Sequence, residues 1–334
     1  MAAEVALPPG HVLERPRAAE VDEMLALVHA CDVAAIGFPD FTADDVREWL
    51  DAPFTTPDAD GWTVRDDQGR LVAWAYLDNQ YGERGDDGTI YLHPDADPSL
   101  YRPLVDLLVN RCAERAAAAG RADHDLVFWS TNEPVLAQTV AAIGARKART
   151  FARMQRGLDG SEGPLPLPDG VGIAGVDHED EAQMRAFHGV YVEAFAGHYG
   201  FERSTYEAWR ASLAAAPGTP YDQWLVASAD GAVVGVMQAA DRAEEGGGWV
   251  RNLAVLATYR GRGIARVLLD QAFALFHARG FTWAGLGVDL ENETGAYRLY
   301  ESVGMHVQFE ADAWELTVPA AALEPDPAGV GGPR

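Results

Sequence analysis

Residues 260–265 combine arginines and glycines, residue types suited to holding an anion, at the start of an amphipathic segment. An apolar run, 253–255, precedes them, and apolar residues follow at the spacing of a helix that buries one face. The order predicts a strand, a tight turn and a helix. A helix start leaves about four backbone N–H groups unpaired and carries the positive end of the helix dipole, which favours phosphate. Gly261 and Gly263 allow close approach of the backbone, and Arg260 and Arg262 add charge.

Two common phosphate-binding motifs do not fit this turn. A Walker loop needs a lysine and a hydroxyl residue after its last glycine, and Ile264 and Ala265 stand there instead. A dinucleotide-binding loop needs a third glycine three residues after Gly263, where the chain has Arg266. The sequence therefore excludes ATP binding of the Walker type and the dinucleotide fingerprint.

The turn does resemble the pyrophosphate loop of the GNAT superfamily of acyl-CoA-dependent N-acetyltransferases. That loop reads Gln or Arg, two residues, Gly, one residue, then Gly or Ala, and Arg260, Gly263 and Ala265 fit it. Residues 292–305 are similar to the family's ending, in which Asn, Ala, Leu-Tyr and Gly follow one another. The resemblance covers residues 171–318 and implies transfer of an acyl group, usually acetyl, from CoA to a primary amine.

The resemblance also implies which residues form the site. Tyr300 shares one helix face with Ala296, Leu299 and Val303, so it is expected to point inward and to protonate the departing thiolate. Residues 249–255 carry no carboxylate where some relatives place a base, so the expected bases are Glu193 and His198, with Glu202 or a water relay as alternatives. Acetyl-CoA is the expected co-substrate, with no metal. The residues expected to bind it are Leu253, Ala254, Val255, Arg260, Gly261, Arg262, Gly263, Ile264, Ala265, Arg266, Asn292 and Tyr300.

Other interpretations of these residues remain open. Tyr300 could be a core tyrosine with a satisfied hydroxyl, and the chain could then be a non-catalytic acyl-CoA sensor. The acceptor could also be a protein or peptide rather than a small molecule, which would require an open groove. The apparent duplication described next favours a small-molecule amine, because a second half can close off such a groove.

The chain appears to contain the same domain twice. Trp, Val, Gly and Val at 62, 64, 69 and 72 recur with identical spacing at 224, 226, 231 and 234. Gly, Asn-Glu and Gly at 120, 132–133 and 144 recur at 280, 292–293 and 304. A length of 334 residues with 48% hydrophobic content is enough for two cores. A repeat of this size predicts a duplicated domain and not a solenoid.

The first half lacks the features that suit a phosphate. Residues 100–105 align with 260–265, and Tyr101 and Pro103 replace the two glycines. Asp95 and Asp97 precede this helix and would repel a pyrophosphate, and Val140 replaces Tyr300. The first half is therefore expected to be a scaffold or one wall of the acceptor site, without a cofactor site of its own.

The expected fold is α/β with a mixed sheet, as two tandem GNAT folds that each have a mostly antiparallel central sheet flanked by helices. The expected boundaries are a degenerate domain at 1–158, a linker at 159–170, a catalytic domain at 171–318 and a disordered tail at 319–334. Expected helices lie at 19–31, 42–50, 100–119, 134–143, 179–196 and 204–215, with hairpins at 62–78 and 224–241 and strands at 126–130, 148–158 and 283–288.

Composition narrows the range of partners. The net charge is −25, with Lys147 as the only lysine, so nucleic acid is a poor partner. The acidic surface either attracts a cationic amine or serves solubility. Cys31 and Cys112 are expected to be buried apolar residues. The start of the chain lacks a signal peptide and no apolar run could span a membrane, so we expect a cytoplasmic monomer or homodimer without a membrane partner.

Overall fold

The computed structural model describes residues 5–51, 55–79, 85–161, 166–215, 219–242, 246–292 and 294–321. The chain forms two compact units. Unit 1 consists of Met1–Thr150 with Ala311–Arg334, and unit 2 of Phe151–Glu310. None of the described helices combines the length and the apolar character needed to cross a bilayer.

Unit 1 has a central sheet with the strand order β1-β2-β3-β4-β5-β12. Its pairs are antiparallel except for β4 and β5, which run parallel. The elements that begin in this half of the chain are β1 (Val12–Glu14), η1 (Ala18–Glu20), α1 (Val21–Ile36), α2 (Ala43–Asp51), α3 (Pro57–Asp60), β2 (Gly61–Arg65), β3 (Leu71–Asp78), β4 (Gly85–Leu92), η2 (Pro98–Leu100), α4 (Tyr101–Ala118), β5 (Asp123–Ser130), α5 (Pro134–Ala142) and β6 (Arg146–Gly157).

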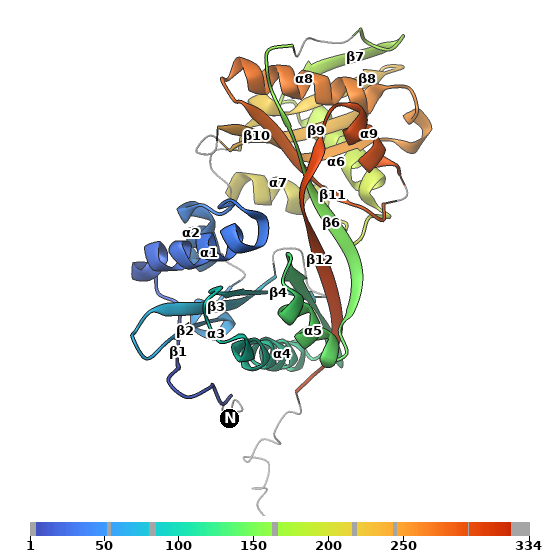
Figure 1. Cartoon of the computed structure of the whole chain (residues 1–334). Helices are drawn as coiled ribbons and strands as arrows, with labels where there is room; N and C mark the ends of the chain where they lie inside the picture. Colours follow the sequence, from blue (N-terminus) through green and yellow to red (C-terminus); the bar gives the residue numbers. More distant parts are fainter. Residues whose placement is uncertain are drawn as a thin grey trace, which may run out of the picture. The chain divides into compact units, whose positions relative to one another are not determined.

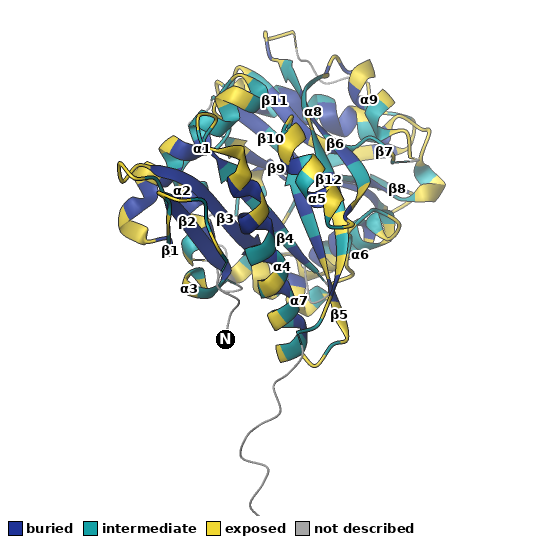
Figure 2. Cartoon of the chain, turned by 60° about the horizontal axis from the view of Figure 1, so that its bottom comes forward, coloured by how far each residue is buried: buried dark blue, intermediate teal, exposed yellow. Residues whose placement is uncertain are grey.

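Both faces of the unit 1 sheet are covered by helices. On one face α1 and α2 pack on Trp74 and Tyr76 of β3, and on the other α4 and α5 pack on residues such as Leu77 and Phe128. Figure 1 shows α1 and α2 above this sheet and α4 below it. Seven of the eight residues of β3 are buried, and Figure 2 shows this strand in the colour of burial. A strand covered on both faces is apolar along nearly its whole length.

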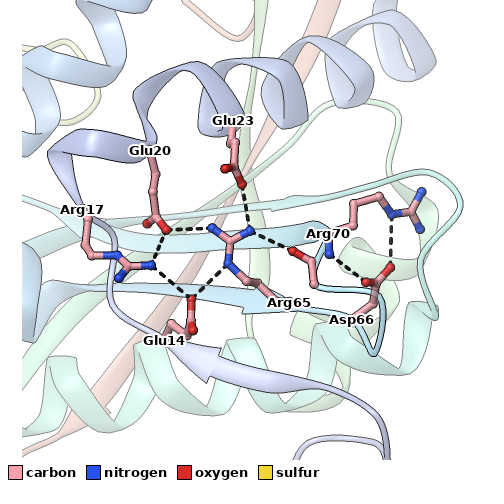
Figure 3. Close-up of polar contacts among 8 residues, drawn as sticks. Glu14, Arg17, Glu20, Glu23, Arg65, Asp66 and Arg70 are labelled. Atoms are coloured by element: carbon pink, nitrogen blue, oxygen red, sulfur yellow. Dashed lines mark hydrogen bonds and ion pairs between the residues drawn. The ribbon is translucent and has the colours of Figure 1, made fainter.

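An ion-pair network ties the edge of the unit 1 sheet to its first helix (Figure 3). The guanidinium of Arg65 on β2 lies 3.0 Å from the carboxylate of Glu14, 2.7 Å from that of Glu20 and 2.8 Å from that of Glu23. Arg17 also hydrogen-bonds Glu20, and these guanidinium groups lower the pKa of the Glu20 carboxyl. One arginine therefore joins β1, η1, α1 and β2.

Unit 2 repeats this architecture, with the strand order β6-β11-β10-β9-β8-β7. Here β10 and β11 form the parallel pair, and the other pairs are antiparallel. The remaining elements are β7 (Val171–Gly175), α6 (Glu181–Phe195), α7 (Tyr206–Ala215), η3 (Tyr221–Gln223), β8 (Leu225–Ala229), β9 (Ala232–Arg242), β10 (Gly247–Val255), η5 (Ala257–Tyr259), α8 (Ile264–Ala278), β11 (Trp283–Asp289), α9 (Ala296–Ser302) and β12 (His306–Pro319).

The unit 2 sheet also has two cores. The larger lies on the face that carries α8 and α9 and includes Leu268, Phe273 and Phe276. The smaller lies under α6 and α7 and includes Phe187 and Trp209. We refer to the two sides as the α8 face and the α6 face. The expected fold class is therefore confirmed, with a mixed sheet flanked by helices in each unit.

The repeated residues adopt the same conformation in both units. Trp62 and Trp224 are each 4% exposed, and each begins the strand region before a hairpin turn. The hairpin glycines, Gly69 and Gly231, both have a φ of +78°. The left-handed conformation is accessible to glycine without steric cost, which explains why the spacing of these glycines repeats.

The division into compact units differs from the expected domain boundaries in two segments. Residues 151–157 of β6 pair with β11 and belong to unit 2, although they lie within the expected first domain. Residues 312–319 of β12 pair with β5 and belong to unit 1, although 312–318 lie within the expected catalytic domain. Each half of the chain thus supplies a strand to the sheet of the other half. The expected linker includes 162–165 and the expected tail includes 322–334, which lie outside the described residues.

Candidate active site

The turn before α8 is open to solvent and held by two glycines. Gly261 has a φ of +75° and Gly263 a φ of +82°, and Gly263 is the N-cap of α8 without a side-chain cap. A Cβ at Gly261 would meet no atom within 4 Å. The first N–H groups of α8 therefore lack a capping side chain at an exposed turn, an arrangement suited to an anion.

The arginines of the turn are available to an anionic ligand. Arg260 donates from Nε to the carbonyl oxygen of Val255 at 3.1 Å, and Arg262 lies over the ring of Tyr259 at 4.8 Å. Within the described part of the chain neither guanidinium forms an ion pair with a carboxylate. Arg266 lies 3.9 Å from Asp270, a long contact between a half-exposed guanidinium and a carboxylate that is only 15% exposed. The turn therefore concentrates positive charge in a chain whose net charge is −25.

A split between two strands leads away from this turn. The parallel pairing of β10 with β11 covers three positions, from Gly247 with Trp283 to Trp249 with Gly285. Beyond it, residues 250–255 of β10 and 286–289 of β11 do not pair with each other, and we call this opening the split. Residues 253–255, expected to bind the co-substrate, lie along it and end at the carbonyl that Arg260 contacts. The unpaired edge of β10 can bind an extended chain.

A β-bulge at Arg251 changes which side chains face each side of β10. The register against β9 shifts between Val250 and Asn252. Before the bulge Val250 lies in the core of the α8 face, whereas after it Val255 does. Asn252 and Ala254 consequently face α6, and Ala254 lies in the core there. Bulges of this kind re-aim side chains and are common beside active sites.

Tyr300 lies inside the α8 face on α9, in the core that also contains Val303 and Met305. It is 8% exposed, and burial raises the pKa of its hydroxyl to about 12. Among the described residues the hydroxyl has no hydrogen-bond partner. A protonated hydroxyl without a protein acceptor can donate a proton to a ligand, so its environment is compatible with the expected acid.

The expected bases lie in different environments. Glu193 is exposed on the last turn of α6, and Glu202 is also exposed. His198 is half-buried against Phe195, with ring centroids 4.4 Å apart. Burial and, second, the Arg260 guanidinium lower the pKa of His198, so its imidazole is neutral at neutral pH. The structure therefore brings His198 near the turn of α8 and leaves Glu193 on the surface.

Asn292 orders the turn that precedes α9. Its Oδ1 accepts a hydrogen bond from the N–H of Thr294 at 2.8 Å, and its own N–H donates to the carbonyl of Asp289. Its side chain thus closes a local turn between β11 and the helix that carries Tyr300.

Two features of this region could not be expected from the residue types. The first is the bulge, because Arg251 sits inside an otherwise regular strand pattern. The second is a hydrogen bond of 2.6 Å from Asn252 Nδ2 to Oε1 of Gln238 on β9. A polar residue within the strand 249–255 is the sequence signal that could have drawn attention to Asn252.

Unit 1 contains a second group of buried polar side chains. One ligand-type atom each from Asp86, Cys112 and His124 lies within 4.8 Å of the others, a set that could hold a metal ion. Arg115 lies 2.7 Å from Asp86, and Arg121 approaches Nδ1 of His124 at 3.2 Å. Because arginine only donates, this contact leaves the proton on Nε2, which faces Asp86 at 3.2 Å. The arrangement is that of an internal carboxylate network balanced by arginines.

Comparisons with known proteins agree with this arrangement. Residues 182–305 match the model of the Acetyltransferase (GNAT) family. The mycothiol acetyltransferase of Beutenbergia cavernae is 32% identical over 217 residues, which are 60% of this chain and 70% of that protein. A GCN5-related N-acetyltransferase from Sphaerobacter thermophilus has a TM-score of 0.83 and 26% identity, covering 95% of this chain and 99% of that one.

The tandem layout also has a structural counterpart. A tandem GNAT protein from the clavulanic acid biosynthesis pathway has a TM-score of 0.65 at 16% identity, covering 93% of this chain and 99% of that one, and it shares the fold. The layout expected from the sequence, two tandem halves similar to those of mycothiol synthase, agrees with these matches. The chain therefore belongs to the GNAT family and is an N-acetyltransferase with two tandem units of that fold.

Proposed function

We propose that unit 2 transfers an acetyl group from acetyl-CoA to the primary amine of a small molecule. The observation that carries the proposal is the continuity between the exposed turn of Gly261 and Gly263, the split that begins beside it, and Tyr300 in the core below. A ligand with an anionic pyrophosphate, an extended amide-containing arm and a terminal thioester matches these three features in order.

The turn holds the pyrophosphate in this proposal. The N–H groups of Gly263, Ile264, Ala265 and Arg266 stand at the positive end of the α8 dipole. Arg260 and Arg262 pair with phosphate oxygens, which guanidinium groups bind in two-pronged geometry. The backbone of residues 253–255 pairs with the pantetheine arm as an added strand, and Asn292 keeps α9 in place beside it.

The chemistry is a direct attack within a complex of both substrates. Tyr300 donates its proton to the departing sulfur, since burial keeps this hydroxyl protonated. The acceptor arrives as an ammonium ion and must lose a proton. We propose Glu193 and His198 as the groups that take this proton, with His198 favoured because its imidazole is neutral and half-buried. A pH profile of the His198→Gln variant that loses one ionisation, against an unchanged profile for Glu193→Gln, supports this ranking.

Two observations support a small acceptor. The relative from Beutenbergia cavernae is named for acetylation of mycothiol, which is a small molecule and not a protein. The acidic charge of the chain also favours the encounter with a cationic amine at low ionic strength.

A panel of acceptors tests the function. The full-length chain is incubated with acetyl-CoA and 2-aminoethanol, 2-phenylethylamine, glucosamine or a lysine-containing peptide, and free CoA thiol is measured over time. Release that depends on a small amine supports the proposal, and release only with the peptide assigns a protein substrate. Binding of acetyl-CoA without release for any acceptor would identify a sensor and overturn the proposed activity.

A further inference from the structure

A pair of amide side chains interrupts the apolar α6 face of β9 and β10. Asn252 and Gln238 stand opposite each other across the two strands and are joined by the 2.6 Å hydrogen bond between their amides. Gln238 is 7% exposed, whereas Asn252 is half-buried and accessible. The residues next to the pair along this face are the apolar Val236, Ala240, Trp249 and Ala254, and the guanidinium groups of Arg153 and Arg242 each lie 5.1 Å from the Trp249 ring.

The pair does not satisfy its own hydrogen-bonding capacity. An amide has a carbonyl oxygen and an NH₂ group, and one bond between two amides leaves one of each available. In the structure these are Oδ1 of Asn252 and the NH₂ of Gln238, and no described residue hydrogen-bonds either group. If both amides were turned around, Asn252 would offer the NH₂ and Gln238 the oxygen. Either way, the pair can still accept one hydrogen bond and donate another.

The position of Asn252 connects the pair to the reaction. It follows the bulge at Arg251 directly and lies near the end of the split where β10 and β11 still pair, away from the Gly261–Gly263 turn. On the α8 face the split is closed by the core that includes Ile264, Leu268 and Tyr300. An acceptor must therefore reach a thioester in the split from the α6 face, where Asn252 projects.

We propose that Asn252 binds the amino group of the acceptor through Oδ1, and that Gln238 is a positioning residue that fixes the Asn252 amide. This inference rests on the proposed function and adds the group that orients the nucleophile. An amide cannot take up the proton of an ammonium ion near neutral pH, so Asn252 orients the amine and does not deprotonate it.

With this assignment, each bond that forms in the reaction is matched by a bond that breaks. The amine first loses a proton to the proposed base, which passes it to solvent, and its lone pair then forms a C–N bond with the thioester carbon. The C–S bond breaks, and the sulfur takes the proton of Tyr300, which is restored as the amide nitrogen gives up its second proton through solvent. Asn252 accepts a hydrogen bond from the remaining N–H and directs the lone pair toward the carbonyl carbon.

Variants of Asn252 in the full-length chain test the inference with the fastest acceptor of the amine panel. Asn252→Ala should raise the KM of the amine about tenfold, the effect of one hydrogen bond in a binding site, while the KM and Kd of acetyl-CoA stay unchanged. Asn252→Asp should keep the amine KM within about threefold of wild type and add an acid limb to the pH profile of kcat/KM, because its carboxylate titrates.

Gln238→Leu and Ser228→Ala complete the set. Gln238→Leu should raise the amine KM about threefold through the released Asn252 amide, and Ser228→Ala on β8, outside the proposed machinery, should match wild type. An unchanged amine KM in Asn252→Ala, an equal rise in the KM of acetyl-CoA, or an Asn252→Asp profile without a new limb overturns the role of Asn252. If wild type acetylates no amine, the proposed function fails and the inference falls with it, a result distinct from all of these.

Discussion

The same strand-turn-helix occurs in both units, but the turn before the helix differs in exposure and in residue type between them. In unit 2 the turn is exposed, and two left-handed glycines precede α8 without a side-chain cap. In unit 1 the aligned residues 101–103 form the first turn of α4, where Tyr101 is buried and Pro103 has no N–H. Asp97 caps the short helix η2 just before α4, where its carboxylate accepts a hydrogen bond from the N–H of Ser99 at 2.9 Å and adds negative charge.

The strands beyond the turn differ in the same way. In unit 1 β4 and β5 pair at four positions, and β4 pairs with β3 without a register shift. Tyr101, which aligns with Gly261, is buried and donates a hydrogen bond to Glu133 at 3.0 Å. In unit 2 the pairing stops one position earlier and the bulge re-aims Asn252. The sheet and its hairpin glycines are thus common to both units, whereas the open turn and the bulge of β10 are features of unit 2, where we propose the chemistry.

The largest effect on stability is expected when the chain is cut at the domain boundary predicted from the sequence. A fragment of residues 159–318 lacks residues 151–157, which pair with β11 and bury Ala152 and Met154. Loss of these contacts exposes a strand edge and apolar surface, so this fragment should be insoluble or unfolded. A fragment of residues 151–310 retains the strand and should unfold cooperatively, as followed by circular dichroism. Equal behaviour of the two fragments would contradict the importance of this strand.

Gly263→Pro should abolish the binding of acetyl-CoA that we propose for the turn of unit 2. Proline holds φ near −65° and lacks an N–H, so it cannot adopt the +82° of Gly263. The Kd for acetyl-CoA should rise at least about 100-fold by calorimetry, with the helical content retained.

The matched control lies in the other unit. Pro103→Gly should leave the affinity unchanged, and wild type should bind one acetyl-CoA per chain. A stoichiometry of two would mean that unit 1 also binds the co-substrate, and wild-type affinity in a folded Gly263→Pro chain would remove the turn from the site.

Tyr300→Phe tests the residue that has Val140 as its aligned counterpart in unit 1. The substitution keeps the ring and removes the hydroxyl, so kcat should fall about 100-fold, at the low end for general acid catalysis because a thiol is a good leaving group. Affinity for acetyl-CoA should change little. Wild-type turnover with chemistry shown to be rate-limiting would make Tyr300 a core residue, and Tyr300→Leu measures the added cost of losing the ring.

The sequence predicted the features that depend on local pattern. The helix after Gly263, the inward side of Tyr300 and the repeated hairpins follow from periodicity and glycine spacing, and the structure has all three. The fold class and the enzyme family were predicted correctly because the anion-binding turn has its own residue requirements.

Features that depend on long-range pairing were not predictable. The strand β4 begins Gly-Asp-Asp-Gly, a composition typical of a turn, yet it is a central strand. It holds the buried carboxylate of Asp86, which pairs with Arg115, and the half-buried carboxylate of Asp87, to which the indole N–H of Trp129 donates at 3.0 Å. The exchange of β6 and β12 between sheets likewise leaves no mark on residue types, since either strand suits either sheet. The bulge at Arg251 appears only when β9 is placed beside β10.

The smallest expected effect concerns Glu133 of unit 1, whose carboxylate accepts the hydrogen bond from Tyr101. Burial, aided by the charge of Asp32, raises the pKa of Glu133 from its ordinary value of 4.5 to about 7. A carboxyl whose pKa is raised on folding binds its proton more tightly in the folded state. The free energy of unfolding therefore falls as the pH rises between about 4.5 and 7. Glu133→Gln removes this titration but keeps an acceptor for the Tyr101 hydroxyl.

Relative to the Glu133→Gln variant, wild type should lose about 1 kcal/mol of stability between about pH 5 and pH 8, the modest size reflecting a half-buried side chain. Urea unfolding of both chains at each pH unit measures the difference. Asp66→Asn is a suitable control because Asp66, paired with Arg70 at the surface, has a lowered pKa and gives the opposite slope, confined to acid pH. If the free energies of unfolding of wild type and Glu133→Gln differ by the same amount at every pH in this range, the carboxyl is ionised in both the folded and the unfolded state. Unit 1 would then keep a carboxylate charge beside Tyr101, just as the turn of unit 2 is proposed to hold an anionic ligand. The two units would differ at this place in the shape of the turn and not in the presence of negative charge.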